Sequence, residues 1–273
     1  MKILIVGGGS MGQSFAHGLS SSGNVNRCAV IEKDPVNAQR CEEIGMSIFS
    51  SIDEVPTSDD WFEPDVCIIA VKPKDIPAVG EKLKTFLPDN CIVISIAAGI
   101  SIATLQETLG DYPIVRAMPN IAASELMSAT AICSADRVSE TELMTARSVM
   151  ESLGTVVRVS EEQMNLVTAI SGSGPAYFFF LAEQMAEAAQ EFGMDVEIAH
   201  KLIAQTFLGA AIIAKEVGSF ATLRERVTSP GGTTQAAIEA FQENGFEKAV
   251  FEGIRAALER GAELDSSAPV QED

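Results

Sequence analysis

The chain has 273 residues, enough for one large domain or two smaller ones, and its content of 47% hydrophobic and 21% charged residues is that of an ordinary globular protein. Its formal net charge is −19 and both halves are acidic, so we expect it to bind neither nucleic acid nor a membrane surface. All five cysteines lie in the first half, with no CxxC pair and no metal-ligand spacing, which predicts reduced thiols in a cytoplasmic protein without a metal site.

The chain opens on an apolar, β-branched run, KILIV, so we expect no signal peptide, and we expect no apolar run to reach the length of a membrane span. Up to residue 160, β-branched runs alternate with amphipathic stretches. Several runs are apolar on both faces, which is typical of a parallel sheet covered by helices on two sides. The predicted strands are Ile3–Val6, Cys28–Ile31, Val66–Val71, Ile92–Ser95, Ile114–Arg116, Thr130–Cys133 and Val156–Val159, and the predicted helices are 10–22, 35–44, 76–86, 101–109 and 139–153.

The strand signal ends near residue 160, where SEEQ (160–163) has the pattern of a helix-capping box. We therefore predict an α/β domain over residues 1–160 and an all-α domain over residues 161–273. The predicted helices of the second domain are 161–192, 195–217, 220–227, 233–243 and 246–263.

One stretch of the second domain, AYFFFLAEQMAEAA (176–189), is apolar around much of its circumference. A helix of this kind must be buried, and a domain of about 110 residues has a limited core in which to bury it. A homodimer with interleaved helices is the explanation that we favour. The alternative is a helix at the centre of its own bundle.

The first glycine-rich segment, VGGGSMG, follows a predicted strand and opens a predicted helix. Its glycines match G-x-G-x-x-G, the dinucleotide-binding pattern of a Rossmann domain, and an acid, Glu32, follows twenty residues later. An acid at this position takes the ribose hydroxyls of NAD, whereas the adjacent Lys33 could pair with a 2′-phosphate, so both NADH and NADPH remain open. We assign to the cofactor Val6, Gly7, Gly8, Gly9, Ser10, Met11, Gly12, Glu32 and Lys33.

The chain is poor in residues that could protonate an alkoxide formed by carbonyl reduction. His17 and His200 fall on predicted helices as surface residues, Tyr112 falls in a turn, and only Tyr177 lies beside a notable motif. Hydride transfer to a protonated imine needs no strong acid, because the C=N bond is already electrophilic. A hydroxyl that orients the nitrogen would suffice.

A second glycine-rich segment, VTSPGGTT (227–234), also runs into a predicted helix. Backbone N–H groups at a helix start, with hydroxyls beside them, form a suitable cradle for a carboxylate. The alternative is a helix start, with a proline in its first turn, that binds nothing. The residues of this candidate site are Ser229, Pro230, Gly231, Gly232, Thr233 and Thr234.

Taken together, these motifs resemble the pyrroline-5-carboxylate reductase family over nearly the whole chain. The resemblance is carried by GGGSMG, AVKP (70–73), SIAAG (95–99), VRAMPN (115–120), SGSGPAY (171–177) and VTSPGGTT, in that order. It implies a Rossmann domain with a mostly parallel sheet, followed by a helical domain that dimerises, with rings of dimers in some members. It also implies reduction of 1-pyrroline-5-carboxylate to L-proline by NADPH or NADH, the last step of proline biosynthesis.

The resemblance also implies roles for particular residues. Thr234 corresponds to a threonine whose hydroxyl reaches the imine nitrogen, and Ser229 would assist it in catalysis. The 229–234 segment would hold the substrate carboxylate, and a break in a helix would bring backbone to the substrate at Ser171, Gly172, Ser173 and Gly174. The cofactor would also be lined by Ala70, Val71, Lys72, Pro73, Ala98 and Asn120.

The chain departs from the family pattern at three places. It reads MPNIAA (118–123) where relatives commonly read MPNTP, and EVGSFATLRER (216–226) where an E-x-P pattern is commoner. Glu32 stands where many relatives have a small or hydroxyl residue and prefer NADPH. The MPNIAA departure concerns the substrate pocket, and the departure at Glu32 concerns the choice of cofactor.

Two other functions were weighed. A β-hydroxyacid dehydrogenase of the 6-phosphogluconate dehydrogenase type also pairs a glycine loop with a helical domain, but it uses a lysine in the first helix of that domain. This chain has no lysine between Lys84 and Lys201. A non-catalytic dinucleotide-binding protein would have no need of SGSGPAY together with SPGGTT.

Overall fold

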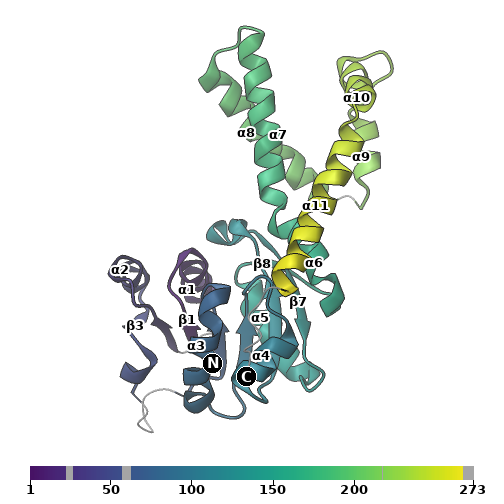
Figure 1. Cartoon of the computed structure of the whole chain (residues 1–273). Coiled ribbons are helices and arrows are strands. Elements are labelled where there is room, and N and C mark those ends of the chain that lie inside the picture. Colours follow the sequence, from purple (N-terminus) through teal and green to yellow (C-terminus); the bar gives the residue numbers. More distant parts are fainter. Residues whose placement is uncertain (23–26, 57–62, 217, 267–273) are drawn as a thin grey trace. The chain divides into compact units, whose positions relative to one another are not determined.

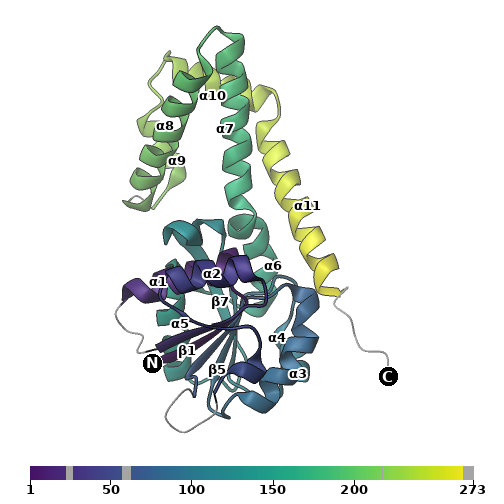
Figure 2. The ribbon, with the colours of Figure 1, turned by 90° about the vertical axis from the view of Figure 1, so that its left-hand side faces the viewer.

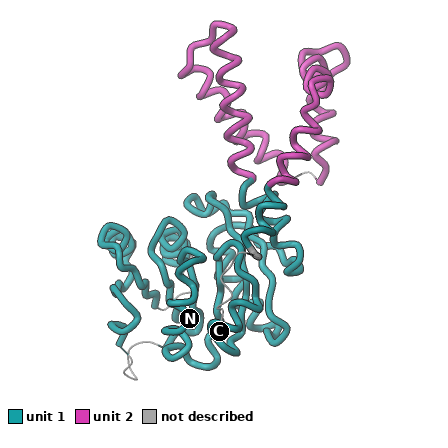
Figure 3. The backbone as a smooth tube through the Cα atoms, viewed as in Figure 1, with its two compact units in different colours: residues 1–173, 257–273 teal, residues 174–256 magenta. Residues whose placement is uncertain are grey.

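The computed structural model describes residues 1–22, 27–56, 63–216 and 218–266 and divides the chain into two compact units (Figure 3). Unit 1 comprises residues 1–173 and 257–273, and unit 2 comprises residues 174–256. Each unit is described by itself. The functional division that we predict at residue 160 remains a prediction.

Unit 1 is built on an eight-stranded sheet in the order β3-β2-β1-β4-β5-β6-β7-β8 (Figure 1). All neighbouring strands are parallel except β6 and β7, so the predicted mostly parallel sheet is confirmed. The short edge strand β3, which has three residues, was not predicted. The strands are β1 Lys2–Val6, β2 Arg27–Ile31, β3 Ser47–Phe49, β4 Val66–Ile69, β5 Ile92–Ser95, β6 Ile114–Met118, β7 Ser128–Ser134 and β8 Gly154–Arg158.

Helices cover both faces of this sheet (Figure 2). Side chains alternate along each strand, so in β1 Ile3 and Ile5 pack on one side while Leu4 and Val6 pack on the other. The first side is covered by α1 (Ser10–Ser22), α2 (Pro35–Glu43) and α5 (Glu140–Glu151), and the second by α3 (Ile76–Phe86) and α4 (Ile102–Leu109). The predicted two-sided burial is confirmed.

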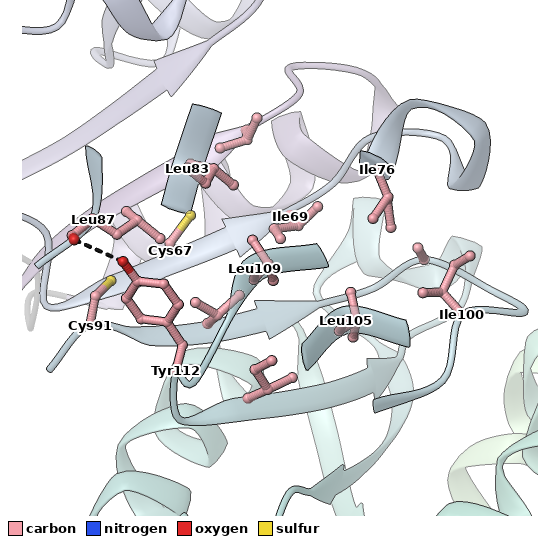
Figure 4. Packing of buried hydrophobic residues seen from close by; sticks show 14 of the residues in the cluster. Cys67, Ile69, Ile76, Leu83, Leu87, Cys91, Ile100, Leu105, Leu109 and Tyr112 are labelled. Atoms are coloured by element: carbon pink, nitrogen blue, oxygen red, sulfur yellow. Dashed lines mark hydrogen bonds between the residues drawn. The ribbon is translucent and has the colours of Figure 1, made fainter. Parts of the chain in front are cut away.

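Figure 4 shows part of the core on the α3–α4 side. Tyr112 is buried there and its Oη donates a hydrogen bond to the Leu87 carbonyl oxygen at 2.9 Å. Cys67 and Cys91 are fully buried nearby, and burial raises the pKa of the Cys91 thiol to about 12, with the charge of Asp65 adding to the effect. All five cysteines are free thiols, as the sequence predicts.

The described elements after residue 160 are helical. The helix predicted over 161–192 is divided, because a π-helical turn (η5, Thr168–Gly172) separates α6 (Met164–Val167) from α7. It is preceded by the short η4 (Glu161–Gln163), in which the Gln163 side chain accepts a hydrogen bond from the Ser160 backbone at 3.1 Å. The remaining helices are α7 Gly174–Glu191, α8 Val196–Glu216, α9 Phe220–Arg226, α10 Thr233–Glu243 and α11 Phe246–Ser266, of which α11 belongs to both units.

The helices of unit 2 leave much of their apolar surface exposed in the single chain. Phe178, Phe179 and Phe180 on α7 are each more than 60% exposed. The prediction that no apolar run reaches the length of a membrane span is wrong for α8, because its residues 196–215 are long and apolar enough to cross one by length and composition alone. Exposed apolar surface of this extent marks an interaction surface.

Candidate active site

The glycine loop lies at the carboxyl ends of the parallel strands, where the strand order reverses between β1 and β4. Gly7 has φ of +105°, and a Cβ at this position would lie 2.6 Å from the Ala70 carbonyl oxygen. A Cβ on Gly12 would lie 1.9 Å from the Gly7 carbonyl oxygen, so the start of α1 packs directly on the loop. A Cβ on Gly9, in contrast, would meet nothing within 4 Å. The open approach to the backbone at Gly9 fits the pyrophosphate of a dinucleotide.

Glu32 follows the last residue of β2 and contacts the same loop. One carboxylate oxygen, Oε2, accepts a hydrogen bond from the Gly8 backbone N–H at 2.7 Å. The other, Oε1, accepts one from the Asp34 backbone N–H, also at 2.7 Å. Asp34 in turn caps α2, and Lys33 between them is exposed. The structure therefore brings together the predicted loop and the predicted acid.

The segment Ala70–Pro73 follows β4 and lies beside the glycine loop. The Ala70 backbone N–H donates to the Val6 carbonyl oxygen at 2.8 Å, and Val71 Cγ1 would lie 3.2 Å from a Cβ on Gly7. Ala98 is exposed in the loop after the next strand, β5. These segments follow the carboxyl ends of neighbouring parallel strands, which is where a Rossmann domain binds its cofactor.

Asn120 connects two of the motifs that carry the family resemblance. It follows β6, is 9% exposed, and its Nδ2 donates to the Ser171 carbonyl oxygen at 3.0 Å. The Ser171 carbonyl lies in η5, where the Ser173 backbone N–H donates to the Thr168 carbonyl at 2.8 Å, five residues back. A Cβ on Gly172 would lie 2.8 Å from Met118 Cε, so VRAMPN and SGSG are packed together. π-Helical turns are frequent at functional sites.

Sequence reasoning missed the polar groups that support this junction. The Asn120 backbone N–H donates to Ser128 Oγ at 3.0 Å, and this hydroxyl is 3.1 Å from the buried Thr130 Oγ1. Both residues are on β7, and the only signal was hydroxyl side chains in an otherwise apolar strand.

An ion pair between a buried arginine and a partly exposed glutamate was also missed. Arg116 Nη1 on β6 lies 3.3 Å from Glu161 Oε1, which also accepts the Ile102 backbone N–H at 2.7 Å. Burial raises the pKa of the neighbouring Cys133 thiol to about 11, with Glu161 raising it further and Arg116 lowering it. The pair joins the start of α4 and β6 to the start of the helical segment.

The second glycine-rich segment lies in unit 2 as the turn between α9 and α10. Two backbone N–H groups of its SPGGTT part (229–234) have acceptors within the chain. The Gly231 N–H donates to the Gln235 side chain at 2.8 Å, and the Gly232 N–H donates to the Ser229 carbonyl at 3.0 Å. Gly231 has φ of +71°, which explains the glycine there.

The start of α10 itself keeps its donors. Gly232 is the N-cap, and no side chain of the described residues caps this helix end. The first backbone N–H groups of a helix have no acceptor within it, so those of Thr233 and Thr234 point out of the first turn. Thr234 is half-buried, whereas Ser229, Pro230 and Thr233 are exposed.

The expected shortage of strong proton donors is also visible in the structure. His17 on α1 and His200 on α8 are both exposed on helix surfaces. The hydroxyl of Tyr112 donates a hydrogen bond within the core. Tyr177 lies in the first turn of α7 and is 38% exposed.

Comparison with known proteins identifies the family. Residues 161–264 match the family model described as pyrroline-5-carboxylate reductase dimerisation, and residues 2–99 match one described as coenzyme F420-dependent NADP oxidoreductase. The pyrroline-5-carboxylate reductase of Pseudomonas aeruginosa is 38% identical over 267 residues, covering 96% of each chain. The chain belongs to the pyrroline-5-carboxylate reductase family. The recognition made from the sequence motifs is confirmed.

Relatives from other organisms support the same family assignment. The pyrroline-5-carboxylate reductase of Arabidopsis thaliana is 33% identical over 270 residues, with 97% of this chain and 96% of the relative covered. The solved structure from Coxiella burnetii is 35% identical with a TM-score of 0.87, covering 96% of this chain and 97% of that one. The Plasmodium falciparum enzyme, solved with NADP bound, is 26% identical with a TM-score of 0.81, covering 97% and 98%.

Family membership settles several of the predictions. The chain is an NAD(P)H-dependent oxidoreductase with a Rossmann domain, and its dimerisation domain implies a homodimer. The matched dimerisation stretch includes α7 and α8, so a partner subunit accounts for their exposed apolar side chains. A pocket of about 330 Å³ in unit 1 is partly lined by the same stretch, at Leu166 and Ile170.

Proposed function

We propose that the chain reduces 1-pyrroline-5-carboxylate to L-proline, the last step of proline biosynthesis, with its cofactor on unit 1 and the substrate carboxylate at the start of α10. The observation that carries this function is the full-length similarity to pyrroline-5-carboxylate reductases, at 32–38% identity for the bacterial and plant enzymes with 89–96% of the relatives covered.

The cofactor role of unit 1 rests on the fit between the glycine loop and a dinucleotide. The loop leaves its backbone open at Gly9 while Gly7 and Gly12 hold it tightly against β4 and α1. Residues 6–12, Glu32 and Lys33 would hold the adenosine and pyrophosphate parts, and Ala70–Pro73, Ala98 and Asn120 would line the remainder. The bound NAD(P)H supplies the hydride.

The carboxylate role of residues 229–234 rests on the uncapped start of α10. The N–H groups of Thr233 and Thr234, together with the positive end of the helix dipole, suit a small anion. The hydroxyls of Ser229 and Thr233 are exposed and add donors. Gly231 and Gly232 present no side chain that would block an approaching carboxylate.

The half-buried Thr234 is the residue that we assign to the imine nitrogen. Its hydroxyl would accept the N–H of the protonated imine and so fix the orientation of the ring. Hydride adds to C5, the C=N π electrons pass to nitrogen, and the product amine is then protonated from solvent. No strong acid is needed, which agrees with the exposed positions of both histidines.

Ser171–Gly174 would present backbone to the substrate. The π-helical turn directs the Ser171 carbonyl to Asn120, so the position of the turn is set by a residue of the cofactor domain. We assign to Asn120 the role of coupling the cofactor site to the substrate-binding segment.

We place the functional division at residue 160, with cofactor binding in residues 1–160 and substrate binding and dimerisation in residues 161–273. Support comes from the dimerisation match, which begins at residue 161. We further propose that dimers assemble into a ring and that the enzyme works in the cytoplasm, in line with its five free thiols. Light scattering of the purified protein measures the number of subunits.

The test of the proposed function is an assay of NADH and NADPH oxidation with 1-pyrroline-5-carboxylate. Thr234→Ala should lower kcat by roughly ten- to a hundredfold, while Thr234→Ser keeps the hydroxyl and most of the rate. Thr145→Ala, at a half-buried position of α5 in unit 1, is the matched control. Wild-type protein that binds dinucleotide but turns over no cyclic imine would contradict the function, and near-normal activity of Thr234→Ala would remove the role of Thr234.

A further inference from the structure

The side chain of Glu32 is fixed at both of its oxygens. Oε2 accepts the Gly8 N–H and Oε1 accepts the Asp34 N–H, each at 2.7 Å. Its backbone is held as well, because the Glu32 N–H donates to the Phe49 carbonyl oxygen at 2.9 Å. The carboxylate therefore occupies a defined position at the end of β2, and it could leave only by giving up two charge-assisted hydrogen bonds.

Packing restricts the same side chain. A Cβ on Gly8 would lie 3.0 Å from Glu32 Cβ and 3.1 Å from Glu32 Cγ, so the aliphatic part of the side chain lies against the glycine loop. Cys41 on α2 packs against the same loop, because its Sγ would lie 3.1 Å from this Cβ.

A carboxylate at this position discriminates between NADH and NADPH. In a Rossmann domain the ribose hydroxyls of the adenosine half lie at the end of the second strand. A carboxylate accepts hydrogen bonds from these hydroxyls, whereas a 2′-phosphate brings a charge of about −1.5 to −2 beside it. We propose that this enzyme is specific for NADH over NADPH and that Glu32 is the residue that determines this specificity.

The neighbouring charges do not offset this repulsion. Lys33 is exposed on the segment between Glu32 and Asp34, so the three residues carry one positive and two negative charges. The Asp34 carboxylate is held at the start of α2 by the N–H groups of Val36 and Asn37, at 3.0 Å each. A 2′-phosphate would therefore meet two carboxylates held by backbone N–H groups and one exposed ammonium group.

Family membership leaves this choice open, since the related Plasmodium enzyme was solved with NADP bound. The inference rests on the cofactor site assigned above, but not on the assignment of the substrate site. It concerns a binding preference, which can be measured without turnover.

The experiment is isothermal titration of the full-length dimer with NADH and with NADPH, followed by kcat/KM for each cofactor. We expect the wild type to bind NADH at least about tenfold more tightly than NADPH. Glu32→Ser should abolish or reverse this preference by strengthening NADPH binding. Glu32→Gln keeps the shape of the side chain, removes its charge and should give an intermediate ratio.

Glu42→Gln is the matched control, because it makes the same change of charge at an exposed position of α2 and should leave the ratio unchanged. Equal or tighter binding of NADPH by the wild type overturns the proposal. Retention of the full NADH preference in both Glu32 variants overturns the role of Glu32. If the NADH preference is found but pyrroline-5-carboxylate is not reduced, the proposed function fails and the inference stands.

Discussion

The amide nitrogen of Asn120 donates a hydrogen bond to the carbonyl oxygen of Ser171 across 51 positions of sequence, at 3.0 Å. The donor follows a strand of the cofactor-binding sheet, and the acceptor lies in the π-helical turn that leads into α7. The Asn120 Oδ1 also accepts the Ala122 N–H at 3.1 Å, so both ends of the side-chain amide are engaged. This side chain holds the two segments in a fixed position relative to each other within unit 1.

Asn120→Ala should therefore affect both stability and activity. Loss of the amide leaves the Ser171 carbonyl without this donor, which should cost about 1–3 kcal/mol in the free energy of unfolding. We expect kcat/KM to fall by more than a reduced fraction of folded protein would explain. The reason is that the turn also positions the backbone that we assign to substrate binding. Urea denaturation and steady-state kinetics measure the two effects. Asn244→Ala, which removes an exposed helix-end hydrogen bond, is the control and should leave kcat/KM unchanged.

Glu161→Ala tests the ion pair beneath the junction. Arg116 is 4% exposed, so removing the carboxylate takes an ionic contact away from a buried guanidinium. Because Glu161 itself is more than one third exposed, we expect a loss of about 1–3 kcal/mol rather than the full cost of a buried pair. Glu162→Ala, at the adjacent exposed position, should change the free energy of unfolding by less than about 0.5 kcal/mol. Equal effects of both substitutions in thermal or urea unfolding would rule out this role for the pair.

Alanine substitutions at two glycines of the first loop should have different effects, one on stability and one on cofactor binding. Gly12→Ala places a methyl group against the Gly7 carbonyl oxygen and should cost about 3 kcal/mol or more in the free energy of unfolding. Gly9→Ala meets no neighbouring atom, so it should leave stability unchanged but weaken NADH binding at least about tenfold by obstructing the pyrophosphate. Melting temperature and cofactor titration separate the two. A Gly9→Ala protein that binds NADH normally would show that the pyrophosphate does not approach here.

The buried thiols predict a loss of stability at alkaline pH. The pKa of Cys91 is raised by burial to about 12 and that of Cys133 to about 11, both from an ordinary value of 9.0. The unfolded thiols ionise first, so their contribution is complete below pH 9.0 and is lost as the pH rises toward the folded pKa, at about 1.4 kcal/mol per pH unit for each thiol. Cys91→Ala should therefore flatten the decline in the free energy of unfolding above pH 9.0. An unchanged slope would contradict the shift assigned to Cys91.

Much of the fold follows from local patterns. The helices predicted at 10–22, 76–86 and 233–243 coincide with α1, α3 and α10, because each has a clear start signal and an apolar face. The sheet was predictable because its central strands are apolar on both faces. The edge strand β3 was not, since three residues are too few to show a period.

The features missed at the site depend on contacts between distant residues. Arg116 and Glu161 are 45 positions apart, and no local pattern pairs a strand arginine with a helix-capping segment. The hydrogen bonds of Gly231 and Gly232 depend on the turn geometry and on the Gln235 side chain, so the number of available N–H groups could not be read from the sequence. The exposure of α7 and α8 in the single chain is consistent with the match of these helices to a dimerisation domain.

The start of α10 is proposed to bind the substrate carboxylate, and Thr233→Pro tests this proposal directly. Thr233 is the first helical residue, where proline is tolerated, and Gly232 before it has φ of −84° and ψ of 171°, an extended conformation compatible with a following proline. The substitution removes one backbone N–H and the side-chain hydroxyl. Thr233→Ala, which keeps that N–H, is the control for the lost hydroxyl.

The measurement is kcat/KM for 1-pyrroline-5-carboxylate and for 1-pyrroline, which lacks the carboxylate. Loss of a hydrogen bond to a charged group, worth about 1.5–3 kcal/mol, should lower kcat/KM of Thr233→Pro for the carboxylated substrate by roughly ten- to a hundredfold. For 1-pyrroline the value should stay within about twofold of the Thr233→Ala value. Equal losses for both substrates, or no loss for either, would contradict the account.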